Sequence, residues 1–344
     1  MKDSEKPSPA HHQPGGFKNL HLEGTAKNFW QLLKWKIGGD GPQGDDAERR
    51  AVPRVNVDTK SIQNPEAAQI TWLGHSTMLV QMHGIAVLTD PIFSKRASPV
   101  GFAGPARYQA PALSIEQLPP IDYAIISHNH YDHLDKPTVQ AIGEKVHWLV
   151  PLGLKAWFNE AGIERVTEFD WWDDITLDGT RFVATPSQHW SARSLTDRYE
   201  TLWASWLVQK EDTRFWFAGD TGYNPHQFKE IGERLGPIDC AAIPIGAYEP
   251  RWFMKDMHVN PEEAVMIHRD IGSRFSVGMH WGTFQLTDEA PLEPRTRLLE
   301  ARAKAGLDAN DFTALAIGET ARIPAAKEKT TPEQLVKDQL EGGL

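Results

Sequence analysis

Residues 122–133 read DYAIISHNHYDH, and this stretch joins a hydrophobic run directly to a cluster of potential metal ligands. The run Asp122–Ser127 is typical of a buried strand. Four ligand-type side chains follow it within six residues: His128, His130, Asp132 and His133. Extended backbone would send the two leading histidines to one side, and a turn after Tyr131 would bring the other two ligands to a neighbouring point. Because imidazole and carboxylate bind Zn²⁺, Fe and Mn²⁺, the stretch predicts a metal site at the end of a strand.

The pattern H-x-H-x-D-H after a short hydrophobic strand resembles the signature of the metallo-β-lactamase superfamily. Three later segments fit the remaining ligand positions of that family: TPSQHW with His189, FAGDT with Asp220, and VGMHWGTF with His280. The match covers about residues 68–320. The resemblance implies an α/β (α+β) protein with a four-layer αββα sandwich and metals at one edge of the sheets.

The family pattern also implies how the ligands divide between two ions. The first site would contain His128, His130, His189 and Asp220, and the second would contain Asp132, His133, His280 and the shared Asp220. A shared carboxylate favours two ions about 3.5–4 Å apart. We therefore expect two Zn²⁺ per chain, although Fe or Mn²⁺ would suit the same side chains. Cys240, the single cysteine, is expected to be a buried core residue.

Additional phrases narrow the resemblance: TWLGHST, LTDPIFSKRASP, GPARY, SQHWSAR, FAGDTGY and HVNPEEAV. Together they resemble the N-acyl-phosphatidylethanolamine phospholipase D family and its bacterial relatives. This implies a zinc-dependent phosphodiesterase that acts on such lipids through a metal-bridging hydroxide and releases phosphatidate and an amide-bearing alcohol. The alternative is hydrolysis of carboxylic esters, lactones or related cyclic substrates, since fold does not determine substrate. A degenerate binding scaffold is disfavoured by the complete ligand set.

Two side chains are candidates for catalytic roles beyond metal binding. Asp132 would orient the nucleophile or transfer a proton. His258, in MHVNPEEAV, precedes a helix cap, and the resemblance suggests that it contacts substrate or relays protons near the metals. The alternative for His258 is an ordinary histidine of a capping region.

Four other residues are candidates for supporting roles. Asp90, in LTDP, would hold a ligand imidazole by a hydrogen bond, or would only form the turn before Pro91. His75, in LGHST, would face the site or cap a turn. Arg96 and Arg107 would meet an anionic phosphate, or would lie in solvent or in surface ion pairs.

Composition limits the class of protein. With 36 Lys and Arg against 46 Asp and Glu, the formal net charge is −10. A dedicated nucleic-acid binder is therefore not expected. Neither a signal peptide nor an apolar run of 18 residues is recognisable, so we expect a cytoplasmic protein. A small molecule or a phospholipid is the expected partner, and the family resemblance is compatible with a homodimer.

The chain divides into three predicted parts. Residues 1–60 are expected to form an arm, disordered over 1–16, with a short amphipathic helix between Thr25 and Ile37 and a linker over 38–60. That helix carries Trp and Lys, so it would pack on the domain or make peripheral contact with a membrane. Residues 61–323 would form the metallo-β-lactamase domain, with strands in hairpins and interleaved helices that indicate two mixed sheets. Residues 324–344 would be a charged tail.

Overall fold

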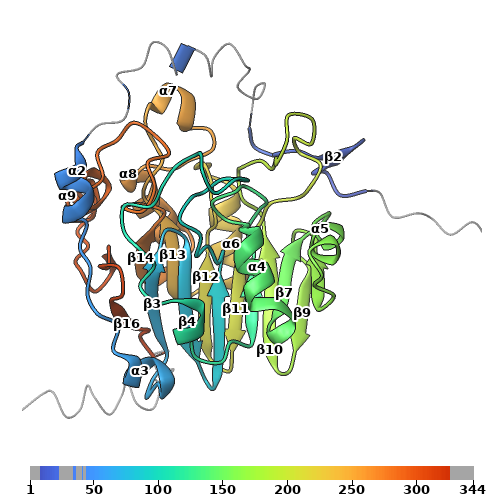
Figure 1. Ribbon diagram of the computed structural model, residues 1–344, viewed down its shortest axis with the longest axis horizontal. Coiled ribbons are helices and arrows are strands. Elements are labelled where there is room, and N and C mark those ends of the chain that lie inside the picture. The colour runs from blue at the N-terminus through green and yellow to red at the C-terminus, as the bar shows by residue number, and fades with distance from the viewer. Residues whose placement is uncertain (1–7, 23–33, 36–40, 42–43, 326–344) are drawn as a thin grey trace, which may run out of the picture.

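A computed structural model describes residues 8–22, 34–35, 41 and 44–325 (Figure 1). Two seven-stranded mixed sheets pack face to face. In spatial order the first is β16 (Thr320–Arg322), β3 (Gln69–Gly74), β4 (Thr77–Met82), β5 (Ile85–Thr89), β6 (Tyr123–Ile125), β7 (His147–Pro151) and β8 (Val166–Phe169). The second is β15 (Phe312–Thr313), β14 (Ser273–Met279), β13 (Ile238–Pro244), β12 (Thr213–Phe217), β11 (Ser205–Lys210), β10 (Thr180–Thr185) and β9 (Asp174–Leu177).

Helices cover the outer faces of both sheets. On the first sheet lie α4 (Lys136–Ile142) and α5 (Lys155–Glu160), and on the second lie α6 (Gln227–Leu235), α8 (Pro261–Asp270) and α9 (Glu293–Lys304). Shorter elements are α2 (Asp46–Ala51), α3 (Thr59–Gln63), α7 (Arg251–Met254), η1 (Ile115–Gln117) and η2 (Gly143–Lys145). The predicted four-layer αββα sandwich is therefore confirmed.

Strand β4 shows how the layers are specified by sequence. Met78 and Val80 face the core between the sheets, whereas Leu79 faces the core beneath the helices. Successive side chains of a strand point to opposite faces, so a strand buried on both faces is apolar throughout. Trp72 and Trp206, both fully buried, occupy the core between the sheets.

The N-terminal region differs from the prediction. Residues 8–16, which were predicted to be disordered, belong to a described segment, 8–22, that contains the hairpin of β1 (His12–Gln13) and β2 (Gly16–Phe17), and His11 and Phe17 of this segment are buried against the domain. The predicted linker, 38–60, contains helix α2 and the first residues of helix α3. Asp45 caps the N-terminus of α2, and Asp58 caps that of α3.

Other predictions fall partly beyond the described residues. Most of the predicted amphipathic helix (23–33 and 36–40) and residues 326–344 of the tail lie outside them. Strand β6 is shorter than the predicted Asp122–Ser127, because the Ser127 amide bonds to the Asp90 side chain instead of a neighbouring strand. Among the described helices, none has the length and apolar character needed to cross a bilayer.

Candidate metal centre

Strand ends bring the predicted ligands together. His128 follows β6, and the turn after it carries His130, Asp132 and His133. In the second sheet the chain direction of β10, β12 and β14 is the same, so the loops after these strands emerge at one edge. Those loops carry His189, Asp220 and His280. Each sheet therefore contributes part of one cluster.

The Asp220 carboxylate lies at the middle of this cluster. Its Oδ2 atom is 3.2 Å from Nε2 of both His133 and His280. The same oxygen is 4.0 Å from Nε2 of His128 and 3.8 Å from Nε2 of His189. One oxygen is thus within reach of imidazoles from both predicted sites, as a shared ligand must be.

Gly219 allows Asp220 to approach the first sheet so closely. Its φ of 59° is in the left-handed region, and a Cβ atom there would lie 2.5 Å from the Ser127 Cβ atom. Any side chain would therefore push the Asp220 loop away from the His128 turn.

Most of the shortest distances between donor atoms match those around a metal ion, and the contact between His128 and His130 is shorter. Ligands bound to one Zn²⁺ at about 2.0–2.1 Å and tetrahedral angles lie about 3.3–3.4 Å apart. Asp132 Oδ2 is 3.3 Å from Nε2 of both His133 and His280. His130 Nδ1 is 2.8 Å from His128 Nε2 and 3.3 Å from His189 Nε2. The side chains present therefore fit two cations.

Unpartnered polar atoms support the same conclusion. Buried atoms that face the centre of the cluster and have no hydrogen-bond partner among the described residues include His133 Nε2, His280 Nε2 and Asp220 Oδ1. Leaving such atoms unpaired costs about 1–3 kcal/mol each. A cation bound among them would offset that cost by accepting lone pairs that the protein leaves free.

Asp90 orients two of the predicted ligands, His133 directly and His128 through Ser127. It accepts hydrogen bonds from the Ser127 amide at 2.6 Å and the Ser127 hydroxyl at 2.5 Å, and it binds His133 Nδ1 at 2.6 Å. Since its hydroxyl donates to Asp90, Ser127 accepts from His128 Nδ1, at 2.9 Å. Both imidazoles are thereby held with Nε2 directed at the cluster, which is the arrangement that the predicted role of Asp90 requires.

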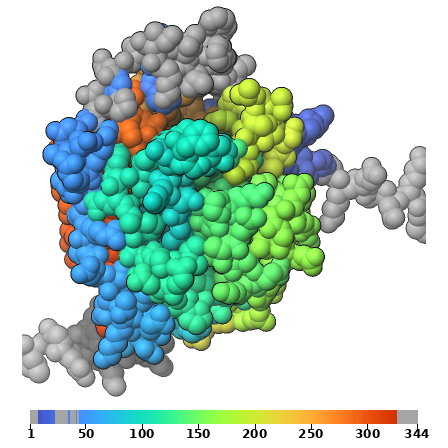
Figure 2. Space-filling view, in the orientation of Figure 1, coloured from blue at the N-terminus to red at the C-terminus, as the bar shows by residue number. Residues whose placement is uncertain are grey.

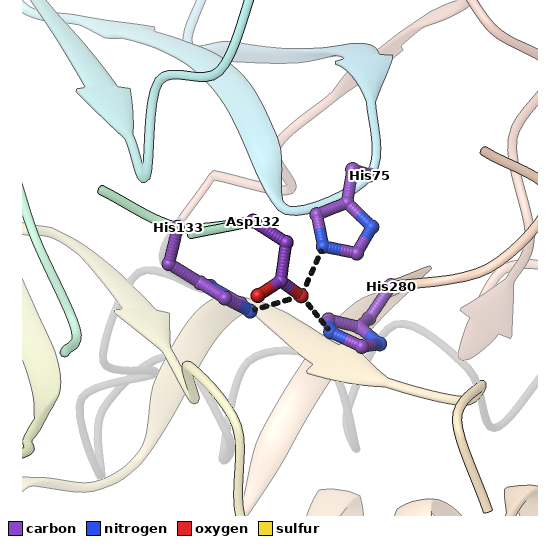
Figure 3. Close-up of side chains that lie close together, drawn as sticks. All are labelled: His75, Asp132, His133 and His280. Atoms are coloured by element: carbon purple, nitrogen blue, oxygen red, sulfur yellow. Dashed lines mark hydrogen bonds and ion pairs between the residues drawn. The ribbon is translucent and has the colours of Figure 1, made fainter. Parts of the chain in front are cut away.

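His75 supports the second group of ligands (Figure 3). Its Nε2 atom lies 3.0 Å from Asp132 Oδ2, the same oxygen that faces His133 and His280. Its backbone carbonyl accepts a hydrogen bond from the His280 amide at 3.1 Å. The residue has φ 55°, an unfavourable conformation for a non-glycine residue that its surroundings maintain. His75 therefore faces the cluster, and its supporting role stays a prediction.

Charges in the cluster are set by burial and by mutual contact. Burial lowers the pKa of His130 to about 4 and that of His75 to about 3, so both imidazoles are neutral at pH 7. Burial acts in the same direction on His280, but Asp220 and Asp132 raise its pKa to about 9. Burial would raise the pKa of Asp220, yet His133 and His280 hold it well below its usual range. An ionised carboxylate is the form that a cation requires, and a bound cation would replace the proton on His280.

His258 faces the same centre without being part of either predicted ligand set. Its Nδ1 atom is 3.9 Å from Asp220 Oδ2 and has no hydrogen-bond partner among the described residues. Burial lowers its pKa to about 4. It is therefore neutral at pH 7 and available to contact a substrate.

A cavity of about 870 Å³ opens onto the cluster. Its polar wall includes His130, Asp132, Asp220, His258 and His280. Its other lining residues are largely apolar, among them Trp35, Trp190, Phe253, Met254, Met257 and Leu286. A ligand there would meet the predicted metal ligands at one end and apolar side chains along its length.

The two arginine candidates lie elsewhere. Neither Arg96 nor Arg107 lines this cavity. Arg96 Nη1 donates to the Gly104 carbonyl, and Arg107 donates to the carbonyls of Ser94 and Ile92. These guanidinium groups hold the long loop 90–110 in shape, so the structure does not bring them to the predicted phosphate position.

Some residues of the site could not be identified from the sequence. Ser127 directly precedes His128, and that adjacency was the available signal for it. Asn19, whose side chain donates to the His189 carbonyl at 2.8 Å, and Trp35 come from the N-terminal region. They are far from the ligands in sequence, and no local pattern connects them to the site.

Comparison with known proteins places the fold and site in context. The family model described as beta-lactamase superfamily domain matches residues 86–281. The N-acyl-phosphatidylethanolamine-hydrolyzing phospholipase D 1 of Caenorhabditis elegans is 44% identical over 321 residues, covering 89% of this chain and 90% of that protein. The mitochondrial N-acyl-phosphatidylethanolamine-hydrolyzing phospholipase D of Saccharomyces cerevisiae is 38% identical over 236 residues, covering 66% of this chain and 50% of that protein.

A solved structure supports the fold independently. Igni18, a metallo hydrolase from Ignicoccus hospitalis, superposes with a TM-score of 0.57 at 19% identity, covering 75% of this chain and 99% of that one. At this identity the likeness concerns the fold alone. Together with the family match and the 44% identical relative, it shows that this chain belongs to the beta-lactamase superfamily of metallo-hydrolases.

Proposed function

We propose that this chain is a binuclear, zinc-dependent phosphodiesterase that hydrolyses N-acyl-phosphatidylethanolamine-like lipids in the manner of a phospholipase D. The position of Asp220 Oδ2, within 3.2–4.0 Å of imidazoles from both ligand groups, carries the binuclear part of the proposal. The two relatives that are named for this activity, at 44% and 38% identity, support the substrate class.

Seven side chains would hold the two ions. His128, His130 and His189 would bind the first, Asp132, His133 and His280 the second, and Asp220 both. When bound, a pair of cations would polarise the phosphoryl oxygens and lower the pKa of water to about 7, which supplies a nucleophile near neutral pH.

The remaining chemistry would come from the chain itself. Asp132 is held by His75 at 3.0 Å, so its carboxylate is oriented and could accept a proton from the attacking water. His258, neutral at pH 7, would donate or accept one hydrogen bond at the substrate phosphate. Expelling water from a largely apolar cavity would strengthen both interactions.

The cavity suits a lipid better than a small polar ester. Its apolar lining, which includes Trp35, Trp190 and Phe253, would bury acyl chains. The indole of Trp35 donates to the Asp288 carboxylate at 2.7 Å and its ring lies 5.1 Å from that of Phe253, so this wall is fixed in place.

Product analysis in isotopic water would test the assignment. Purified protein with measured zinc content would be incubated with N-acyl-phosphatidylethanolamine vesicles, a small aryl phosphodiester and a lactone, in water enriched in oxygen-18. We expect cleavage of the bond between phosphorus and the alcohol oxygen, with the label in phosphatidate and none in the released N-acylethanolamine.

Matched variants would connect that result to the site. Asp220→Asn should abolish hydrolysis, whereas Asp46→Asn removes the same charge on the exposed helix α2 and should leave it unchanged. Cleavage of the lactone alone, or less than one metal ion per chain, would contradict the proposal.

The proposal includes peripheral contact with a membrane. Leu195, which lines the cavity, is fully exposed, and the nearby helix α7 presents Trp252 at 43% exposure. Lys34, from the predicted amphipathic helix, lies 5.3 Å above the Trp252 ring. Leu195→Ser with Trp252→Ser should reduce sedimentation with vesicles, and unchanged sedimentation would reject this contact. The homodimer stays a prediction, which analytical ultracentrifugation would test.

A further inference from the structure

The N-terminal strap, defined here as residues 8–22, is bound along the loop that carries one of the metal ligands. Figure 2 shows its violet surface beside the yellow-green segment around residue 195. The Phe17 amide donates to the Tyr199 carbonyl at 2.9 Å. A Cβ atom on Gly16 would lie 2.0 Å from that same carbonyl oxygen, so only glycine permits this approach.

Two histidines fasten the beginning of the strap. His11 Nε2 and His12 Nε2 bind different oxygens of Asp170, at 2.6 and 2.8 Å. His11 is buried and stacks on Trp171, with ring centroids 4.3 Å apart. We call His11, His12 and Asp170 the latch.

The strap then reaches the metal centre through Asn19. Asn19 Nδ2 donates to the His189 carbonyl at 2.8 Å. A carbonyl can only accept, so the amide orientation is fixed. On its other side, His189 Nδ1 donates to the Met257 carbonyl at 3.0 Å. The ligand is therefore held through its ring by one segment and through its backbone by the strap.

Asn19 has a feature that packing alone does not explain. Its Oδ1 atom is buried and has no hydrogen-bond partner among the described residues. Such an atom is unfavourable, and an apolar residue of similar shape would avoid it. The hydrogen bond that Asn19 Nδ2 donates to the His189 carbonyl therefore explains why this position has an amide side chain.

We propose that Asn19 is a positioning residue for the first metal site, where it fixes the backbone of His189, and that the latch holds the strap in the place this requires. The inference rests on the proposed function only in taking His189 as a metal ligand. Loss of the Asn19 donor would let the His189 backbone shift, which would change the ligand geometry at the first ion and lower its affinity.

Cobalt substitution would test this without any substrate. Metal-free full-length protein would be titrated with Co²⁺ while the visible d–d absorption, which reports ligand geometry, is recorded. Asn19→Ala and the near-isosteric Asn19→Asp, which cannot donate, should shift these bands and weaken Co²⁺ binding about 10-fold. Lys18→Ala, an exposed neighbour in the strap, should match the wild type.

A double-mutant cycle would test the latch. If Asp170 acts through Asn19, Asp170→Asn should shift the bands in the same direction, but should add little in the Asn19→Ala background. Should Asn19→Ala fail to fold, Asn19→Asp gives the same reading at nearly unchanged volume.

The outcomes separate the two proposals. Wild-type spectra and affinity in both Asn19 variants would overturn the positioning role. Fully additive effects of Asp170→Asn and Asn19→Ala would overturn the latch. Normal Co²⁺ behaviour with no phosphodiester hydrolysis would reject the proposed substrate and leave this inference standing, whereas a wild type that binds no Co²⁺ would overturn both.

Discussion

The molecule contains two clusters of histidine and aspartate that look alike in composition but differ in geometry. In the predicted metal centre, the shortest contacts of Asp132 and Asp220 are 3.0–3.3 Å long and that between His128 and His130 is 2.8 Å, but several buried atoms have no hydrogen-bond partner among the described residues. In the latch, His11 and His12 are 2.6 and 2.8 Å from separate oxygens of Asp170, which are hydrogen-bond distances. Among the described residues, no buried polar atom of the latch lacks a hydrogen-bond partner, whereas the predicted metal centre leaves several such atoms free for a ligand.

The two clusters also differ in which ring nitrogen of each histidine makes the hydrogen bond. His128 and His133 are held at Nδ1 by Ser127 and Asp90, so their Nε2 atoms are directed inward. The latch imidazoles use Nε2 itself for the Asp170 contact. A metal site thus requires hydrogen bonds that orient the imidazoles as well as the right residue types. This difference between the metal centre and the latch leads to four predictions.

Removing the shared carboxylate should have the largest effect. Asp220→Asn takes one charge from both ion sites, and we expect kcat/KM to fall by more than about 100-fold, beyond the usual effect of outer-contact changes. Elemental analysis should show fewer than two ions per chain. Retention of both ions with high activity would show that Asp220 is no shared ligand.

Weakening the hydrogen bond that orients His133 should have a smaller effect than removing Asp220. Asp90→Asn keeps the shape but loses the charge that holds His133, so we expect metal affinity to fall about 10–100-fold. Competition with a chromophoric chelator would measure it. Affinity equal to that of the wild type would mean that Asp90 serves only the turn.

Changes at His75 should affect the second ion selectively. His75→Ala removes the contact to Asp132 at 3.0 Å while leaving the first ligand group intact, and we expect a loss of affinity of about 10-fold for one ion of the two. Stepwise metal titration by calorimetry would separate the ions. Equal weakening of both steps would contradict the selective role.

The latch should affect stability more than chemistry. Asp170→Asn weakens two charge-assisted hydrogen bonds, so we expect the free energy of unfolding to fall by about 2 kcal/mol, with a smaller loss of activity than in Asn19→Ala. Although burial raises the pKa of Asp170, the hydrogen bond from His11 holds it below its usual value. The stabilisation should therefore be present at pH 5–6 and decline as pH falls below about 4, the unfolded value.

Chemical denaturation of wild type and Asp170→Asn, at pH 5–6 and again below about pH 4, would measure the difference in their free energies of unfolding. A stability gap that stays constant down to pH 3 would show that the Asp170 charge is not what fastens the strap.

Local patterns in the sequence predicted the sandwich and the clustering of the seven side chains proposed as ligands. The H-x-H-x-D-H pattern, FAGDT and the alternating or fully apolar strands are short-range signals, and the structure brings those seven side chains together as expected. Helix α8 begins at another short-range signal, because Asn260 and Glu263 form a capping box and Pro261 occupies the first position of the helix.

Long-range contacts explain what the sequence did not reveal. His11 and Phe17 are held by Asp170 and Tyr199, more than 150 positions away, so the polar, glycine-rich residues 8–16 resembled a disordered arm. Arg96 and Arg107 were compatible with phosphate binding by residue type. Only the path of loop 90–110 shows that backbone carbonyls occupy them. Strand β8, VTEF, mixes polar and apolar residues and gave no clear signal.

The division of ligands between the sheets has a mechanical consequence. Each ion, once bound, would link a histidine of the turn after β6 to the Asp220 loop of the opposite sheet. Bound cations would therefore cross-link the two sheets at the cavity end of the sandwich. At the opposite end the sheets are joined by side-chain packing and by His83, which lies in the hairpin between β4 and β5 and contacts Thr213 at 2.7 Å and Glu211 at 3.1 Å. The ion-depleted protein should therefore loosen from the cavity end first, and amide exchange should accelerate in the loops after β6 and β12 before it does so in the hairpin that joins β4 to β5.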